Sequence, residues 1–258
     1  MQVSVLASGS KGNSIFVEAG ETRILVDAGI SARRIKKALG DIDVAIEDLD
    51  GILLTHEHRD HIGGLKTLTK NYHIPIYTRE DTFRSMYCVE DISSECFHAI
   101  GEDFKVGNLK IQAFNISHDA ADPVGYSIFQ KDQKCTIVTD LGFVSSSVQA
   151  AIDHSNLLVL EANHDLQLLK DGAYPWSLKQ RILSNRGHLS NSDAAWALVR
   201  MQKEQTAVIL AHLSEENNRP EVAQSTVCEI VERQGFDLTN ELAVHLAKPN
   251  ETVTLFAE

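Results

Sequence analysis

The chain has 258 residues, of which 43% are hydrophobic, and its formal net charge is −12. This length and apolar content suit a soluble enzyme with a large core, and no apolar run reaches the about 20 residues that a membrane-spanning helix needs. The negative charge argues against a broad basic surface for nucleic acid. Because the N-terminus lacks signal-peptide features and the four cysteines show no C-x-x-C pairing, we expect a reduced protein of the cytoplasm.

Hydrophobic periodicity predicts strands first, followed by alternating strands and helices. The expected strands cover 2–6, 14–18, 23–27, 51–55, 109–116, 125–130, 134–140, 156–161, 207–212 and 252–256. The expected helices cover 32–39, 62–70, 175–183, 193–203 and 221–234. No linker, repeat or low-complexity run interrupts this series, which predicts one α/β domain over residues 1–258.

The segment from His56 to His61 holds three histidines and a carboxylate directly after an apolar run. Side chains alternate along an extended chain, so His56 and His58 point to the same side and can share one ion. Asp60 and His61 stand where the next helix begins and are available to a second ion. Imidazoles and carboxylates suit zinc, manganese or iron, and the absence of thiolates argues against a closed structural site. The alternative, a turn with solvated histidines, is rare at this density.

Further polar residues follow or end other apolar runs that read as strands. Loops at one edge of a layered α/β sheet converge on the ligand, so these residues are expected to lie together. They are Asp27, His56, His118, Asp140, Glu161 and His212.

These motifs resemble the metallo-β-lactamase fold superfamily over nearly the whole chain, which implies a four-layer αββα sandwich. Leu25 to Gly29 resembles its first motif, the segment from His56 to His61 its second, and Ile116 to His118 its third. Val138 to Asp140 and Leu210 to His212 resemble the fourth and fifth. The resemblance implies two divalent metal ions: His56, His58 and His118 bind one, Asp60, His61 and His212 bind the other, and Asp140 bridges them.

The same resemblance gives two carboxylates a supporting role and two residues a catalytic one. Asp27 and Glu161 are expected beside the ligands, where such groups tune metal affinity by about 10- to 100-fold. Asp60 and His188 are assigned to catalysis. His188 would donate a proton to the leaving oxygen or hold a phosphoryl oxygen, and its alternative role is to help begin the helix that follows.

Two downstream segments, Glu161 to Asp165 and Arg186 to Ala195, resemble ribonuclease Z. The YycJ/WalJ family of bacterial hydrolases is a closer match, through Ser8 to Asn13, Asn163 to Asp165, Gly187 to Ser190 and His212 to Asn218. That family implies a DNA exonuclease, with manganese preferred over zinc and iron also compatible with the donors. Expected substrate contacts are Ser8, Ser10, Asn13, Asn163 and Arg186. The glycine-serine loop is equally compatible with an anion-binding nest and with a simple hairpin.

Charge is the main objection to a nucleic-acid substrate. Two bound divalent ions would return roughly four positive charges to the site, so the local field can differ in sign from the global one. Lys179, Arg181 and Arg186 lead toward His188 and are the basic residues expected nearest the substrate. The alternative function is a metallohydrolase of a small ester, lactone or thioester, and a third reading is a metal-binding scaffold without catalysis.

Overall fold

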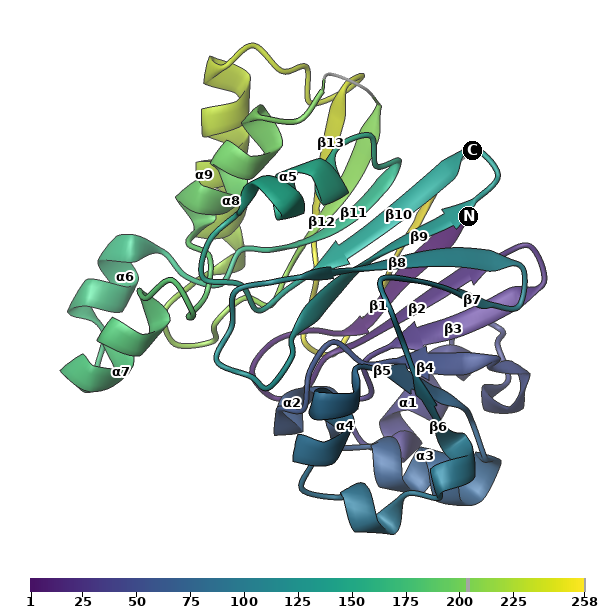
Figure 1. Cartoon of the computed structure of the whole chain (residues 1–258). Helices are drawn as coiled ribbons and strands as arrows, with labels where there is room; N and C mark the ends of the chain where they lie inside the picture. Colours follow the sequence, from purple (N-terminus) through teal and green to yellow (C-terminus); the bar gives the residue numbers. More distant parts are fainter. Residues whose placement is uncertain (203–204, 258) are drawn as a thin grey trace.

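The computed structural model describes residues 1–202 and 205–257, which form two seven-stranded sheets packed face to face. Helices cover both outer faces (Figure 1). The four-layer αββα sandwich expected from the sequence is therefore confirmed.

The first sheet is built mostly from the N-terminal part of the chain. It contains β1 (Gln2–Ala7), β2 (Ser14–Ala19), β3 (Thr22–Val26), β4 (Gly51–Leu53), β5 (Ile76–Thr78), β6 (Phe97–Ala99) and β14 (Val253–Phe256), in the order β14-β1-β2-β3-β4-β5-β6. Its outer face is covered by α1 (Ala32–Gly40), α2 (Arg59–Ile62), α3 (Leu65–Tyr72) and α4 (Glu80–Ser85).

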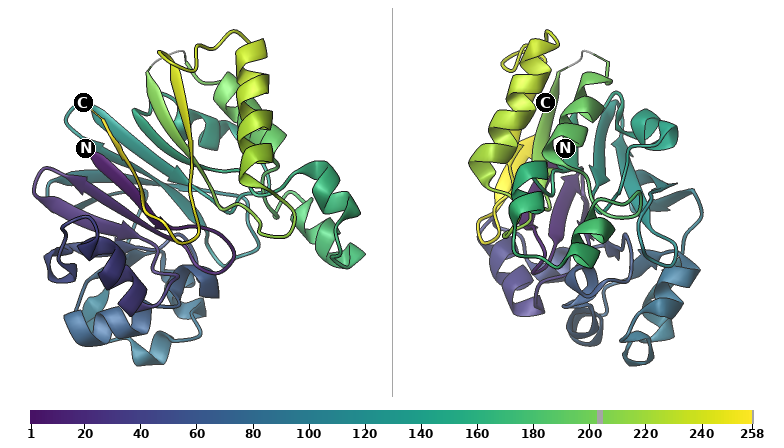
Figure 2. Two further views of the ribbon diagram at one scale, coloured as in Figure 1. Left: turned by 180° about the vertical axis from the view of Figure 1, so that it is seen from behind. Right: turned by 90° about the vertical axis from the view of Figure 1, so that its left-hand side faces the viewer.

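The second sheet takes the rest of the strands. It contains β7 (Asp103–Val106), β8 (Leu109–Asn115), β9 (Val124–Gln130), β10 (Gln133–Val138), β11 (Leu157–Glu161), β12 (Thr206–Ala211) and β13 (Leu242–Leu246), in the order β13-β12-β11-β10-β9-β8-β7. Its outer face carries α5 (Ser146–Ile152), α8 (Asn191–Val199) and α9 (Pro220–Arg233), while α6 (Leu166–Asp171) and α7 (Trp176–Ile182) form an arm that projects from the body (Figures 1 and 2).

The central strands are buried on both faces, which explains why they read as continuous apolar runs. In β3, Ile24 and Val26 face the core between the sheets, and Leu25 faces the helices outside. In β11, Val159 faces the central core and Leu160 packs under the outer helices. Alternation along each strand thus fills three apolar layers at once.

Parallel strands bring the functional loops to one edge. β3 to β6 run parallel in the first sheet, and β10 to β13 run parallel in the second. Crossover connections return the chain to the same end each time, so the carboxyl ends of β4, β10, β11 and β12 share one side of the sandwich.

All ten predicted strands are present, with boundaries within two residues. The predicted helix over 62–70 is two helices instead, because Gly63 and Gly64 separate α2 from α3. A Cβ on Gly64 would lie 2.3 Å from the Ile30 carbonyl oxygen, so this close backbone contact requires glycine. The helix predicted over 193–203 is α8, and its expected end at Lys203 lies outside the described residues.

The elements that the sequence did not predict are short. β5 and β6 have three residues each, and β7 has four, too few to show a period. In residues 1–202 and 205–257, no helix combines the length and apolar character that crossing a membrane requires.

Candidate metal centre

Seven predicted ligand side chains meet at the edge where the two sheets end. Close contacts cross the boundary between the sheets: His61 Nε2 lies 3.2 Å from Asp140 Oδ2, and His58 Nδ1 lies 3.3 Å from His118 Nε2. Their nitrogen and oxygen atoms form overlapping groups within 4.8 Å of one another. The groups are His56, His58 and His118; Asp60, His61 and His212; and His56, His61 and Asp140.

Three of the strand-end residues adopt left-handed backbone conformations. The strands were predicted to run through Asp27, Asp140 and His212, but they end one or two residues earlier, and these residues have φ of 63°, 60° and 56°. Such conformations are uncommon for residues other than glycine and concentrate at functional sites. The turn redirects each side chain out of the sheet and toward the cluster.

Asp27 holds the part of the cluster that comes from the first sheet. Its Oδ1 accepts a hydrogen bond from the Thr55 backbone N–H at 2.9 Å, and Oδ2 accepts from the Thr55 hydroxyl at 2.8 Å. His61 Nδ1 lies 2.7 Å from the same Oδ2. The carboxylate therefore fixes the ring and turns His61 Nε2 toward the cluster, which is the usual arrangement beside a metal-binding histidine.

Glu161 has the same role on the second sheet but supports two rings. Its Oε1 lies 2.9 Å from His188 Nδ1 and 2.7 Å from His212 Nδ1. Its Oε2 accepts backbone N–H groups of Leu141 at 3.1 Å and Leu189 at 3.0 Å. One fully buried carboxylate thus joins the loops after β10 and β12 to the segment before α8.

The nitrogen atoms left over suit metal ions. His56 and His118 also have Nδ1 engaged, by the Thr55 hydroxyl at 3.0 Å and the Gly187 carbonyl at 3.2 Å. The Nε2 atoms of His56 and His212 are buried without a hydrogen-bond partner among the described residues. Unsatisfied buried nitrogen is costly, and a cation bound by imidazole and carboxylate would satisfy it. The residues present therefore fit the metal ions expected from the sequence.

Protonation in the metal-free chain follows from the same crowding. Burial and neighbouring imidazoles hold the pKa of His56 well below its usual range. Burial also disfavours protonation of His212, but Asp140 and the other nearby carboxylates outweigh it and raise its pKa to about 10. Burial opposes ionisation of Glu161, but His188 and His212 outweigh it and lower its pKa to about 2. Without metal, the carboxylates therefore keep a proton on His212, at a ring that could otherwise bind a cation.

Comparison with known proteins places the chain in a family. Residues 22–213 match the Beta-lactamase superfamily domain. The chain is 38% identical over 253 residues to the exodeoxyribonuclease YycJ of Bacillus anthracis, covering 96% of each chain. The chain belongs to the beta-lactamase superfamily.

Two further matches agree with this membership. The exodeoxyribonuclease WalJ of Streptococcus pneumoniae is 38% identical over 258 residues, which cover 98% of this chain and 96% of the relative. The solved metallo-beta-lactamase fold protein YhfI from Bacillus subtilis superposes with a TM-score of 0.71 at 17% identity, over 98% of this chain and 99% of that one. The resemblance to the superfamily and to its YycJ/WalJ branch is confirmed.

In this superfamily member, a cavity of about 250 Å³ opens beside the cluster. Of the five expected substrate contacts, Ser10 and Asn163 line it. Ser8 instead accepts a hydrogen bond from the His212 backbone N–H at 2.6 Å. Asn13 is buried and places Nδ2 3.1 Å from His61 Nε2. Both residues support ligand histidines from the glycine-serine loop.

The basic residues expected near the substrate are also engaged with the protein. Arg186 is exposed and donates through Nε to the His118 carbonyl at 3.3 Å. Arg181 lines the cavity, but Asp119 accepts both of its donors, at 2.6 Å and 2.9 Å. Lys179 points inward and donates to backbone carbonyls of the arm. Only Arg181 is paired with a carboxylate; Arg186 keeps an exposed charge without an acidic partner among the described residues, and the charge of Lys179 is turned into the arm.

Sequence reasoning missed the amides that hold the loops together. Asn218 donates to the carbonyls of Ala162 at 2.9 Å and Asn163 at 3.0 Å, and it pairs with the Asn191 amide at 2.8 Å. These side chains fix the loop after β12 against the loop after β11. The spacing of residues in the sequence does not predict these hydrogen bonds, because their acceptors are backbone carbonyls far away in the chain.

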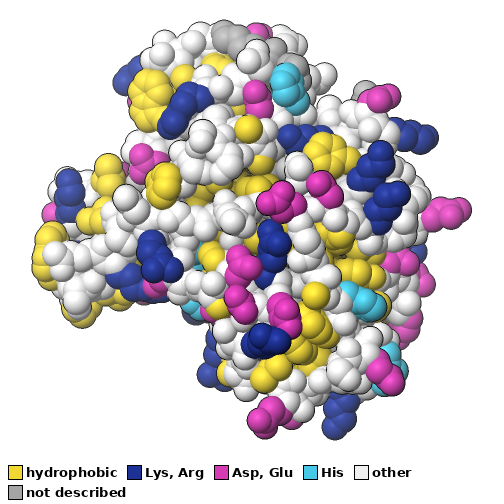
Figure 3. All heavy atoms as spheres, in the orientation of Figure 1, with side chains coloured by type: hydrophobic (Ala, Val, Ile, Leu, Met, Phe, Trp, Pro, Cys, Tyr) yellow, Lys and Arg dark blue, Asp and Glu magenta, His cyan; other side chains and the backbone are white. Residues whose placement is uncertain are grey.

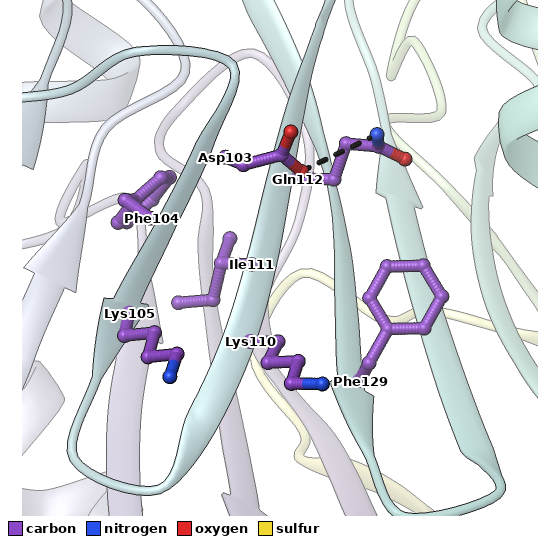
Figure 4. Close-up of a pocket in the computed structure, with 7 residues that line it drawn as sticks. All are labelled: Asp103, Phe104, Lys105, Lys110, Ile111, Gln112 and Phe129. Carbon is purple, nitrogen blue, oxygen red and sulfur yellow. Dashed lines mark hydrogen bonds between the residues drawn. The ribbon is translucent and has the colours of Figure 1, made fainter.

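A larger cavity of about 560 Å³ lies away from the cluster, over β7, β8 and β9 (Figure 4). Lys105 and Lys110 are paired across neighbouring strands there, and Phe129 follows Lys110 in the same cross-strand row. Its lining contains no histidine and one carboxylate, Asp103, which accepts from Gln112 at 3.4 Å. The predicted metal ligands that line a cavity, such as His58, Asp140 and His212, line the smaller one.

Proposed function

We propose that the chain is a binuclear metal-dependent phosphodiesterase that acts on nucleic acid, as a DNA exonuclease. The observation that carries this proposal is the double cluster around Asp140, with His188 beside it, in a chain similar over its whole length to proteins named exodeoxyribonucleases. DNA rather than RNA, and attack from an end, follow from the names of those relatives.

The proposed ligand sets follow two groups that lie on either side of Asp140. His56, His58 and His118 would hold one divalent ion, and Asp60, His61 and His212 would hold the other, with the Asp140 carboxylate beside both sets. When bound, two such cations supply a nucleophile from water at neutral pH and neutralise charge on the phosphoryl oxygens. We prefer manganese over zinc for the active form, and metal analysis with reconstitution by each ion decides between them.

His188 is proposed to act on the leaving oxygen. Its Nδ1 is held by Glu161, the ring lines the cavity, and Glu161 outweighs burial to raise the pKa of His188. A protonated imidazole at this position can donate a proton, which is typically worth about 10²- to 10⁴-fold in rate. Asp60, whose pKa is lowered because His61 and His212 outweigh burial, remains a carboxylate that can orient the attacking water.

The His188 assignment has a competing geometry, because Asp140, Glu161, His188 and His212 also form a group within 4.8 Å. His188→Ala separates the two roles. A proton donor loses most of the rate at full metal content, whereas a ligand loses a metal ion.

Surface charge provides little long-range attraction for a polyanion, because the formal net charge is −12. On the face of the described residues that Figure 3 shows, Lys and Arg side chains are scattered among Asp and Glu rather than gathered in one band. Binding should therefore depend on few phosphate contacts, and each contributes about one unit to the log–log dependence on salt.

The deciding experiment uses metal-reconstituted protein with end-labelled single- and double-stranded DNA and RNA, a small phosphodiester and a thioester. We expect metal-dependent loss of terminal nucleotides, abolished in His58→Ala. Intact nucleic acid together with thioester or lactone hydrolysis that His58→Ala abolishes would replace the nuclease by a small-molecule hydrolase.

We further propose that the chain works as one domain in the cytoplasm. Residues of both sheets share the central core, including Val5 and Ile24 from the first sheet and Ile137 and Val159 from the second. The four cysteines form no disulfide among the described residues, as expected for a reducing compartment. A single unfolding transition, and recovery in the cytosolic fraction, are the corresponding tests.

A further inference from the structure

The cavity beside the metal centre has two chemically different walls. One wall consists of the polar cluster, with Ser10, Asn163 and Ser214 at its margin. The other wall is the arm, which contributes Tyr174, Leu178, Arg181 and Ile182. The proposed chemistry uses the first wall and leaves the second without a role.

The arm is a fixed wall. Lys179 is buried, and its Nζ donates to the carbonyls of Lys170 at 2.6 Å and Gly172 at 2.7 Å, which joins α7 to the end of α6. Asp165 accepts the N–H groups of Gln167 and Leu168 and begins α6. The fork between Arg181 and Asp119 ties α7 to the loop that carries His118. A ligand entering the cavity therefore meets a surface that is already arranged.

The arm surface is suited to a flat, largely apolar group. Leu178 and Ile182 are four residues apart on α7 and so lie on one face of the helix. Tyr174 lies just before α7, is half-buried, and its hydroxyl makes no hydrogen bond within residues 1–202 and 205–257. The Arg181 charge is already paired with Asp119, so it does not create demand for a second anion.

We propose that this wall binds the nucleobase of the terminal nucleotide, with Tyr174 as the stacking residue, while the polar wall takes the adjoining phosphate. The proposal rests on the proposed nuclease function and deepens it. Aromatic stacking holds any base, because every base has a π face, so it gives affinity without sequence preference. Tyr174 is a positioning residue here, since it sets where the strand end sits relative to the metal centre.

The size of the cavity connects this wall to digestion from an end. Its volume of about 250 Å³ lies near the lower end of the range for small-molecule pockets, which suits one nucleotide better than several. The arm stands on the far side of that nucleotide. A strand with a free end needs room there for one nucleotide only, whereas an uninterrupted strand must also run on past the arm.

The first test measures binding alone, by calorimetry of the metal-loaded protein with deoxyadenosine 5′-monophosphate and with deoxyribose 5-phosphate. We expect the nucleotide to bind about 5- to 150-fold more tightly, the range that one stacked base contributes. Tyr174→Ala and Tyr174→Leu should abolish this ratio, and Tyr174→Phe should keep it. The Leu variant retains apolar bulk, so it serves if the Ala variant does not fold.

Trp176→Ala is the matched control. Trp176 is an aromatic residue on the same arm, 63% exposed, and it does not line the cavity. It should leave the ratio unchanged. Equal affinity of the two phosphates for the wild-type protein, or an equal loss in Trp176→Ala, would overturn the proposal.

A second test separates this inference from the nuclease function. For the wild-type enzyme, an oligonucleotide that ends in an abasic nucleotide should have a higher KM than one with an intact end. For Tyr174→Ala, the two oligonucleotides should have the same KM. If the wild-type enzyme digests the abasic and the intact ends with equal KM, base stacking is refuted and the nuclease function is retained. A nucleotide preference in binding, with no oligonucleotide degraded, refutes the nuclease while the base site stands.

Discussion

The two sheets hold their shares of the metal centre in different ways. From the first sheet, one continuous segment, the loop after β4 together with α2, supplies His56, His58, Asp60 and His61. One supporting carboxylate, Asp27, contacts the Nδ1 side of His61. From the second sheet, His118, Asp140 and His212 come from three separate loops. There Glu161 contacts His188 and His212 and accepts two backbone N–H groups from further segments.

This difference teaches that the two carboxylates are not equivalent. Ligands on one short segment are already close together, so Asp27 only orients a side chain within that segment. The ligands of the second sheet come from separate strand ends, and Glu161 holds these ends in position relative to one another. Loss of Glu161 should disturb several segments at once, and the variants below test that ranking.

The largest effect is expected from removing the group that both halves share. Asp140→Ala should lose both metal ions, and activity should fall by more than the about 10- to 100-fold that is typical of supporting residues. His61→Ala should reduce metal occupancy as well. Elemental analysis of purified variants measures this, and two metal ions per chain in both variants would sink the ligand assignment.

Glu161→Gln should follow, with metal affinity reduced by roughly 100-fold, the upper end of the range for supporting groups. The amide keeps the size of the side chain but removes the charge that two imidazoles share. Its NH₂ group would face either the N–H groups of Leu141 and Leu189 or the two imidazole Nδ1 atoms. Competition with a chelator measures the affinity. If metal affinity falls no further in Glu161→Gln than in Asp27→Asn, the two carboxylates have equivalent roles and the ranking is wrong.

Asp27→Asn should weaken metal binding by about 10-fold, because only His61 depends on that carboxylate for its orientation. The same chelator competition applies. Circular dichroism provides the control, since the fold should be unchanged.

The pH dependence of the metal-free protein should come from rings on both sides of the centre, because Asp140 and other carboxylates outweigh burial and raise the pKa of His61 as well as that of His212. The share of His212 can be measured by itself. His212 has its pKa raised from 6.5 to about 10, so it binds more protons folded than unfolded near neutral pH. The stability that this proton contributes is present below pH 6.5 and is lost as pH rises toward 10. Thermal unfolding of the metal-free protein should therefore shift down by a few degrees over this window.

The control for that shift is the protein with metal bound, or His212→Gln without metal. In both, the proton on His212 is absent at every pH, so the decline between pH 6.5 and 10 should shrink. His56, whose pKa lies below its usual range, should contribute nothing to this window. An equal decline in His212→Gln would assign the effect to other groups.

The smallest effect is expected at the hydroxyl that supports Asp27. Thr55→Val removes the hydrogen bond to Asp27 Oδ2 and the contact with His56 Nδ1, and a buried bond of this kind is worth about 1 kcal/mol. Denaturant unfolding measures the loss, and metal affinity should change less than in Asp27→Asn. A larger effect on affinity than on stability would make Thr55 a member of the metal site in its own right.

How far the sequence predicts this site depends on how each residue is held. The cluster from His56 to His61 can be predicted because its ligands lie close together in the sequence. Glu161 can be predicted because it ends an apolar strand. Asp27 and Asp140 were placed at strand ends correctly, but their left-handed backbone was not foreseen, since strand periodicity does not show where an extended run must turn out of the sheet.

The residues that sequence reasoning placed least well are those whose partners are far away. Lys179 was expected to face the substrate, but a lysine that caps the carbonyls of a preceding helix has the same sequence signature as an exposed one. Ser8 and Asn13 were expected to contact substrate, and their bonds to His212 and His61 depend on a loop packing that no local pattern encodes. No sequence motif or periodicity marked Tyr174 as a residue of the cavity.

The position of the cluster at the seam between the sheets has a consequence for the chain in the cell. Ligands from both sheets would bind the same pair of ions, so occupancy and folding are linked by mass action. For one site, free metal at 100 times its dissociation constant adds about 2.7 kcal/mol to the free energy of unfolding, a sizeable part of what holds a domain together. Metal scarcity would then lower the amount of folded protein as well as its rate, and supply of the ion would set its lifetime against proteolysis.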